Sequence, residues 1–84
     1  MTDLRDLFEE VVVRTGLASF IGPGVVRRAL NSVGIYRVED ATREDYIRAL
    51  PALRARMATY LSSEQLETRL RDIGSLLRSS VHGS

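Results

Sequence analysis

The spacing of the apolar residues limits the fold of this chain more than any other feature. The first segment shows the i, i+3, i+4, i+7, i+8 spacing of one buried helical stripe, at Leu4, Leu7, Phe8, Val11 and Val12. Three valines in a row also suit a strand, but no second run alternates apolar and polar residues to pair with it. The helical spacing recurs in later segments. The sequence therefore predicts an all-α protein, a compact bundle of four to five short helices with antiparallel neighbours.

Glycine and proline mark the boundaries of the first two helices. Gly16 predicts the end of the first helix, because glycine accepts the left-handed backbone conformation at low cost. Thr2 is in the right place to cap the start of that helix. The second helix is predicted over 23–33, since proline fits the first helical turn, where its missing N–H costs nothing. Gly34 then closes it.

Two capping boxes predict where the later helices begin. Thr42 with Asp45, and Ser62 with Gln65, stand at the three-residue spacing in which each side chain accepts from the other residue's backbone N–H. The third and fourth helices are therefore expected to start at these pairs.

Two positions inside the later helices leave boundaries open. Pro51 removes a backbone donor and disfavours the α conformation of Leu50, so either the third helix ends there or one longer helix kinks. Gly74 costs about 1 kcal/mol against alanine, which predicts either a close helix contact or an early end of the fourth helix.

The apolar faces of all four segments define the expected core. It comprises Leu7, Phe8, Val11, Val26, Leu30, Ile47, Leu53, Met57, Leu66, Leu70 and Ile73. Tyr60 continues the apolar face that runs through Met57. Adjacent apolar pairs exceed what one stripe per helix needs, and each pair is either core or an exposed partner surface. These pairs are Val12–Val13, Phe20–Ile21, Ile35–Tyr36 and Leu76–Leu77.

Length and composition point to one small domain. With 84 residues and no cysteine, the chain is expected to form a single helical domain over 1–78, without disulfides, followed by a flexible tail over 79–84. A cytoplasmic location is expected, because the N-terminal region lacks the basic start and apolar stretch of a signal peptide. No run of about 20 apolar residues could span a membrane.

Residue types suited to catalysis are scarce. The single histidine, His82, falls in the predicted tail, where a general base cannot be held within reach of a substrate. The serines occur at helix caps and in the tail, without a positioned base. We therefore expect no enzymatic activity, no cofactor and no small-molecule substrate.

A run of acids between the second and third helices resembles a metal loop only loosely. Glu39, Asp40, Glu44 and Asp45 are oxygen ligands, but their order lacks the alternation and central glycine of a calcium loop. Arg43 would also place a positive charge in such a site. Helix capping is the preferred interpretation, and no metal is expected.

A glycine–proline–glycine run at 22–24 precedes a helix that carries Arg27 and Arg28, which would suit a phosphate group at a helix N-terminus. However, Pro23 removes one of the N–H donors, and neither a P-loop nor a dinucleotide fingerprint is complete. A turn that reverses the chain is the preferred interpretation.

The charges are unevenly distributed although they nearly cancel. Twelve arginines and no lysine face 11 acids, for a net charge of +1. The first 24 residues hold four acids and two arginines (−2), and residues 25–60 hold seven arginines and four acids (+3). A helix-turn-helix-like nucleic-acid-binding regulator is one alternative, with Arg48, Arg54 and Arg56 facing phosphates. Glu44, one turn before Arg48, would weaken it by pairing with that arginine.

The favoured function is a non-catalytic protein–protein interaction module with an adaptor or regulatory role in signalling. Its partner would be another protein or a second copy of the chain, as in a homodimer, and not a membrane. In size and helix number the chain resembles short adaptor modules of signalling proteins, including death-fold bundles. This resemblance rests on architecture and carries over no functional residue. The candidate partner-binding residues are Phe20, Arg27, Arg28, Tyr36, Arg48, Arg54 and Arg56.

Overall fold

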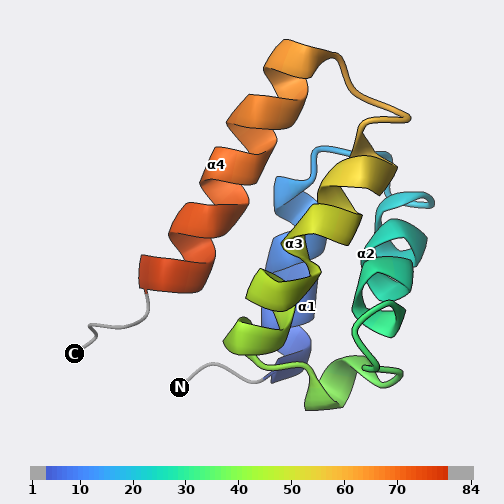
Figure 1. Ribbon diagram of the computed structural model, residues 1–84, viewed down its shortest axis with the longest axis vertical. Coiled ribbons are helices and arrows are strands. Elements are labelled where there is room, and N and C mark those ends of the chain that lie inside the picture. The colour runs from blue at the N-terminus through green and yellow to red at the C-terminus, as the bar shows by residue number, and fades with distance from the viewer. Residues whose placement is uncertain (1–3, 80–84) are drawn as a thin grey trace.

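Four α-helices and one short 3-10 helix make up the part of the chain that the structure, a computed structural model, describes (residues 4–79). The elements are α1 (Leu4–Arg14), α2 (Gly22–Asn31), the 3-10 helix η1 (Val38–Asp40), α3 (Arg43–Met57) and α4 (Ser63–Ser79). Consecutive α-helices run in opposite directions, and α3 packs between α2 and α4 with α1 behind it (Figure 1). The predicted all-α bundle is confirmed. The predicted cap at Thr2 and residues 80–84 of the predicted 79–84 tail lie outside the described residues, whereas Ser79 is the last residue of α4 and not part of a tail.

Gly34 ends α2 by the mechanism that the sequence predicts. Its φ of +87° is left-handed, and its N–H donates to the carbonyl oxygen of Asn31 at 3.0 Å. The N–H of Ile35 donates to the carbonyl oxygen of Leu30, also at 3.0 Å. These two bonds form a Schellman motif, which satisfies the last carbonyl groups of the helix. Because the turn uses the residues before the glycine, α2 ends at Asn31 and not at the predicted Val33.

Gly74 and Gly34 are expected to respond in opposite ways to the same substitution. Gly74 lies inside α4, which continues past it, and the atoms nearest to a Cβ built there belong to the flexible guanidinium of Arg78, at 3.2 Å. We expect Gly74→Ala to raise the free energy of unfolding by about 0.5–1 kcal/mol. Gly34→Ala should lower it by about 1–2 kcal/mol, because the left-handed backbone is strained for alanine although no atom lies within 4 Å. Urea unfolding followed by circular dichroism measures both values. A loss of stability in Gly74→Ala would show that Arg78 cannot move aside.

Both predicted capping boxes are present. The N–H of Asp45 donates to Oγ1 of Thr42 at 3.3 Å, and the N–H of Thr42 donates to Oδ2 of Asp45 at 2.9 Å. The N–H of Gln65 donates to Oγ of Ser62 at 3.3 Å, and the N–H of Ser62 donates to Oε1 of Gln65 at 3.2 Å. Each box satisfies two backbone donors that a helix start would otherwise leave unpaired.

Pro51 lies inside one continuous helix, which resolves the boundary that the sequence leaves open. α3 extends over Arg43–Met57 with the proline near its middle. Since proline has no N–H, the carbonyl oxygen of Ile47 cannot receive its usual helical hydrogen bond. Both Pro51 and Ile47 are exposed, so this carbonyl lies on the solvent side of α3, where water can replace the missing donor.

The predicted core is confirmed except at two positions. Ile47 was expected inside but is 44% exposed, because α2 and α4 cover two sides of α3 and leave this side open. Leu70 is only half-buried. The core also contains residues outside this predicted set. These are Val25, Ala29, Ala41, Tyr46, Ala49 and Leu77.

Polar contacts join α4 to the other helices. Nη1 of Arg14 on α1 lies 2.7 Å from Oδ1 of Asp72, and Nη1 of Arg43 donates to the carbonyl oxygen of Leu76 at 3.1 Å. These contacts join residues far apart in the sequence. They therefore hold α4 against α1 and α3, which precede it in the sequence.

Candidate functional site

A groove of about 290 Å³ opens between the first turn of α2 and the end of α3. Three of the seven predicted partner-binding residues meet in it: Phe20, Arg28 and Arg56. We call it the aromatic–arginine groove. Its full lining is Phe20, Ile21, Gly24, Val25, Arg28, Arg56, Thr59 and Tyr60.

A tight turn between α1 and α2 places Phe20 on one wall of the groove. The N–H groups of Ile21 and Gly22 both donate to the carbonyl oxygen of Ala18, at 2.9 Å each. Gly22 is buried against α1, where a Cβ would lie 3.0 Å from the side chain of Val12. This backbone arrangement leaves Ile21 half-buried and Phe20 84% exposed.

Tyr60 lies on another wall because α3 ends before it. The N–H groups of Tyr60 and Leu61 both donate to the carbonyl oxygen of Met57, at 2.9 and 3.0 Å, so the chain turns away from the helical path. The expectation that Tyr60 continues the buried face is therefore wrong, and its side chain is 51% exposed. The helical period on which that expectation was based stops at Met57.

Arg28 and Arg56 bring unpaired positive charge to the groove. Within the described part of the chain, neither guanidinium forms an ion pair with a carboxylate. The first turn of α2 adds to this field, because a helix N-terminus carries about half a positive charge. Gly24 also has an N–H without an acceptor among residues 4–79. Two exposed rings beside two free guanidiniums suit a ligand that carries both an anionic and an apolar group.

Two other predicted partner-binding residues lie outside the groove. The guanidinium of Arg27 stands over the ring of Phe8, 5.4 Å from its centroid, so it covers the edge of the core. Tyr36 is 78% exposed and follows the opposite end of α2 from the groove. It is an exposed aromatic ring that does not line the groove.

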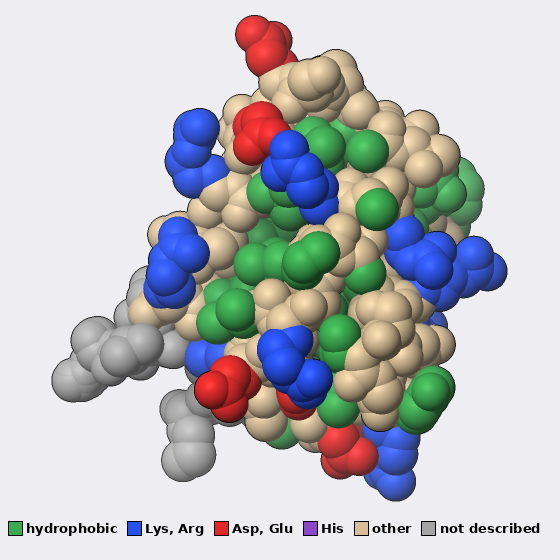
Figure 2. Space-filling view, viewed as in Figure 1, with side chains coloured by type: hydrophobic (Ala, Val, Ile, Leu, Met, Phe, Trp, Pro, Cys, Tyr) green, Lys and Arg blue, Asp and Glu red, His purple; other side chains and the backbone are tan. Residues whose placement is uncertain are grey.

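The predicted row of arginines on α3 is divided between different partners. Nη2 of Arg48 lies 2.6 Å from Oδ1 of Asp45, and Arg54 forms an ion pair with Glu67 on α4. Only Arg56 reaches the groove. On the face drawn in Figure 2, arginines are scattered, some of them beside acids, and do not merge into one basic patch. Residues 42–61 therefore lack a continuous set of free cations for a phosphate backbone.

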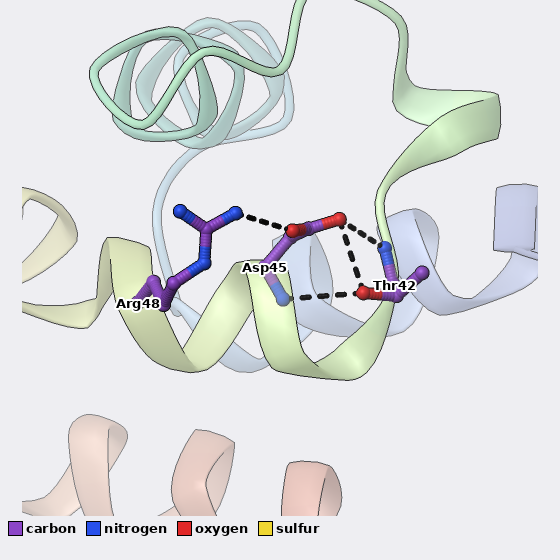
Figure 3. Close-up of polar contacts among 3 residues, drawn as sticks. All are labelled: Thr42, Asp45 and Arg48. Carbon is purple, nitrogen blue, oxygen red and sulfur yellow. Dashed lines mark hydrogen bonds and ion pairs between the residues drawn. The ribbon is translucent and has the colours of Figure 1, made fainter.

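The charged cluster at the start of α3 has a structural role (Figure 3). The N–H of Thr42, followed by the guanidinium of Arg48, holds the pKa of Asp45 below its ordinary 3.8. Burial, followed by the charge of Asp45, raises the pKa of Tyr46 well above its usual value. Here Arg48 pairs with Asp45 and not, as the sequence suggested, with Glu44.

The pKa of Asp45 makes the stability of the domain depend on acid. A lowered pKa means that the ionised carboxylate contributes stability in full above about 3.8, and that this contribution disappears as the pH falls through the folded-state value. We expect Asp45→Ala to cost about 1 kcal/mol at pH 7 and less at pH 3. Denaturant unfolding at several pH values tests this. The control Glu44→Ala removes an exposed acid from the same turn and should change stability little at any pH. An equal, pH-independent loss in both variants would contradict the assignment.

Two acids of the run that resembles a calcium loop form ion pairs with arginines. Glu39 lies 3.7 Å from Arg5 and 3.9 Å from Arg37, and Asp40 lies 3.8 Å from Arg37. Among residues 4–79, no group of three or more histidines, cysteines or acids is placed to hold a metal ion.

A second hollow, which the sequence did not predict, is lined by three acids and two arginines and so carries a small excess of negative charge. This acidic cleft of about 600 Å³ lies between α1 and the later part of α4. Asp6 and Glu9 form no ion pair with a described residue, whereas Glu10 lies 3.5 Å from Nε of Arg14. Val13 is 73% exposed at its side. The full lining is Asp6, Leu7, Glu9, Glu10, Val13, Arg14, Arg43 and Leu76.

Comparison of the chain with models of known protein families, with curated proteins and with solved structures gives no match. None of the helices within residues 4–79 is long and apolar enough to cross a membrane.

Proposed function

We propose that this protein is a non-catalytic interaction module that binds an acidic segment of a protein partner in the aromatic–arginine groove. The observation that carries the proposal is the meeting of Phe20 and Tyr60 with Arg28 and Arg56 around one hollow. Exposed aromatic and arginine side chains dominate the binding energy of protein interfaces. Free guanidiniums favour carboxylates, which they bind in a bidentate manner.

A binding role also fits what lines the groove. Among the described residues, the aromatic–arginine groove is lined by no histidine or carboxylate, which are the usual general bases. The surface charge is small overall, so recognition depends on local complementarity and not on a long-range field. An adaptor or regulatory role in the cytoplasm is part of this proposal.

Selection from a displayed peptide library tests the proposal. The wild-type protein should enrich peptides in which acids flank an aromatic or aliphatic residue. Arg28→Glu combined with Arg56→Glu should weaken binding of these peptides at least about tenfold. The charge-matched control is Arg71→Glu combined with Arg78→Glu, two exposed α4 arginines outside the groove. Enrichment of no peptide, or equal binding by the groove variant, would refute the proposal.

Single-stranded nucleic acid is a second candidate, because bases stack on aromatic rings beside arginines. The geometry of Phe20 and Tyr60 favours this ligand over a duplex. An oligothymidylate added to the same protein should then bind with an affinity that falls steeply with salt. Binding that is absent at low salt, or that is unchanged in Arg28→Glu with Arg56→Glu, would eliminate this candidate.

A further inference from the structure

We infer that the partner of the aromatic–arginine groove is a second copy of this chain, which offers its acidic cleft. The inference rests on the proposed function and names the partner that the groove receives. It is carried by three features of the described residues: charge, apolar exposure and the separation of the two surfaces.

The free charges of the two hollows are complementary. Asp6 and Glu9 stand at the i, i+3 spacing on α1, so their carboxylates share one face of the helix. Neither forms an ion pair within residues 4–79, and the same holds for Arg28 and Arg56. Two unpaired acids in the cleft and two unpaired arginines in the groove are therefore available in every molecule, while Arg43 in the cleft donates to the carbonyl oxygen of Leu76 and keeps its charge. Contact between the groove of one copy and the cleft of another would pair all four.

The apolar surfaces match in the same way. Phe20 is 84% exposed at the groove and Val13 is 73% exposed at the cleft. Val13 follows Glu9 by four residues and thus lies on the same face of α1. The cleft is about twice as large as the groove, about 600 against 290 Å³, so it has room for a protruding side chain. Leu7 and Leu76 give it apolar walls.

The arrangement favours a head-to-tail contact over a pairing of two grooves. The groove and the cleft share no residue, so one molecule can use both surfaces at once. Two grooves placed face to face would bring four free arginines together, which like-charge repulsion opposes. A contact between different surfaces continues as a chain of molecules unless rotation closes a ring.

Sedimentation velocity on paired variants tests this inference. The groove variant carries Arg28→Glu and Arg56→Glu, and the cleft variant carries Asp6→Arg and Glu9→Arg. The wild-type protein should self-associate, more strongly at low salt than at high salt. Each variant alone should associate at least about tenfold more weakly. An equimolar mixture should regain association, because the intact groove of one variant meets the intact cleft of the other and the two charge-reversed surfaces also attract each other. A chain with all four changes should also regain association.

Controls separate this inference from the proposed function. Arg71→Glu with Arg78→Glu should still self-associate, since it alters charge equally outside both surfaces. Circular dichroism confirms that each variant is folded. Phe20→Asp and Val13→Arg, at strongly exposed positions, form a second variant pair if a charge reversal unfolds the domain. A wild-type protein that stays monomeric, or a mixture that fails to associate, overturns self-association. If the groove still binds selected acidic peptides in that case, the proposed function stands.

Discussion

Replacement of Leu53 by alanine is expected to lower the free energy of unfolding by about 2–5 kcal/mol. Leu53 is 2% exposed on α3, the helix that packs between α2 and α4, so the lost methyl groups leave a cavity that two neighbouring helices must close. A domain of this size has a total stability of about 4–13 kcal/mol. The variant should therefore lose a large share of it. Denaturant unfolding at pH 7 gives the difference directly.

Ile47→Ala is the matched control for this prediction. It removes an apolar side chain from the same helix, but Ile47 is 44% exposed, and much of the side chain is already in water. We expect a loss of about 1 kcal/mol or less. If both variants lost the same stability, α3 would not be packed as the structure places it.

Replacement of Phe20 by alanine is expected to weaken binding of a selected acidic peptide about thirtyfold, which corresponds to about 2 kcal/mol for an aromatic residue central to an interface. The stability of the domain should change by no more than about 0.5 kcal/mol, because the ring is 84% exposed and holds little of the core. Isothermal titration calorimetry measures the first quantity and thermal unfolding the second.

Tyr36→Ala supplies the comparison for Phe20→Ala. Tyr36 is almost as exposed, at 78%, but does not line the groove. Its loss should leave peptide binding unchanged. Equal weakening by both substitutions would mean that exposed rings bind the peptide irrespective of the groove, and the site would have to be placed elsewhere.

Helix boundaries were predictable from the sequence where the signal is local. The Thr42–Asp45 capping box and the turn at Gly34 consist of contacts between residues a few positions apart in the sequence. Their effect on the helix ends therefore does not depend on the rest of the fold. The outcome at Pro51 was not predictable in this way. A helix that continues past Pro51 loses one backbone hydrogen bond but buries Leu53 and Met57 in the core. The continuous helix shows that this packing outweighs the lost hydrogen bond.

The groove was predictable only in part for a similar reason. The sequence selected Phe20, Arg28 and Arg56 as partner-binding candidates, because an apolar pair in a turn and arginines on helices are visible without a fold. It did not reveal which arginines are neutralised from another helix. Arg54 meets Glu67 across the α3–α4 interface, and that pairing has no local signature. Tyr60 was missed because nothing in its spacing shows that the helix has already ended.

In each of the four apolar pairs one residue is more buried than its neighbour. In the pair Leu76–Leu77, Leu77 is buried and Leu76 is half-buried. Val13, Phe20 and Tyr36 are exposed while their neighbours Val12, Ile21 and Ile35 are half-buried. Adjacent residues on a helix or in a tight turn point about 100° apart, so only one of the two can face the core fully. The apolar residues in excess of one stripe per helix therefore lie largely at the surface. Of the exposed ones, Phe20 lines the groove and Val13 lines the cleft.

The burial of Gly22 against Val12 has a consequence for how freely this chain can vary. Most surface positions tolerate exchange, but a methyl group at position 22 would lie 3.0 Å from the side chain of Val12, so either that side chain or the turn that presents Phe20 must shift. A substitution at Gly22, which lines neither hollow, would thus alter the wall of the groove that Phe20 forms. A library randomised at this position should return glycine whenever partner binding is selected, and should accept other small residues when only folding is selected.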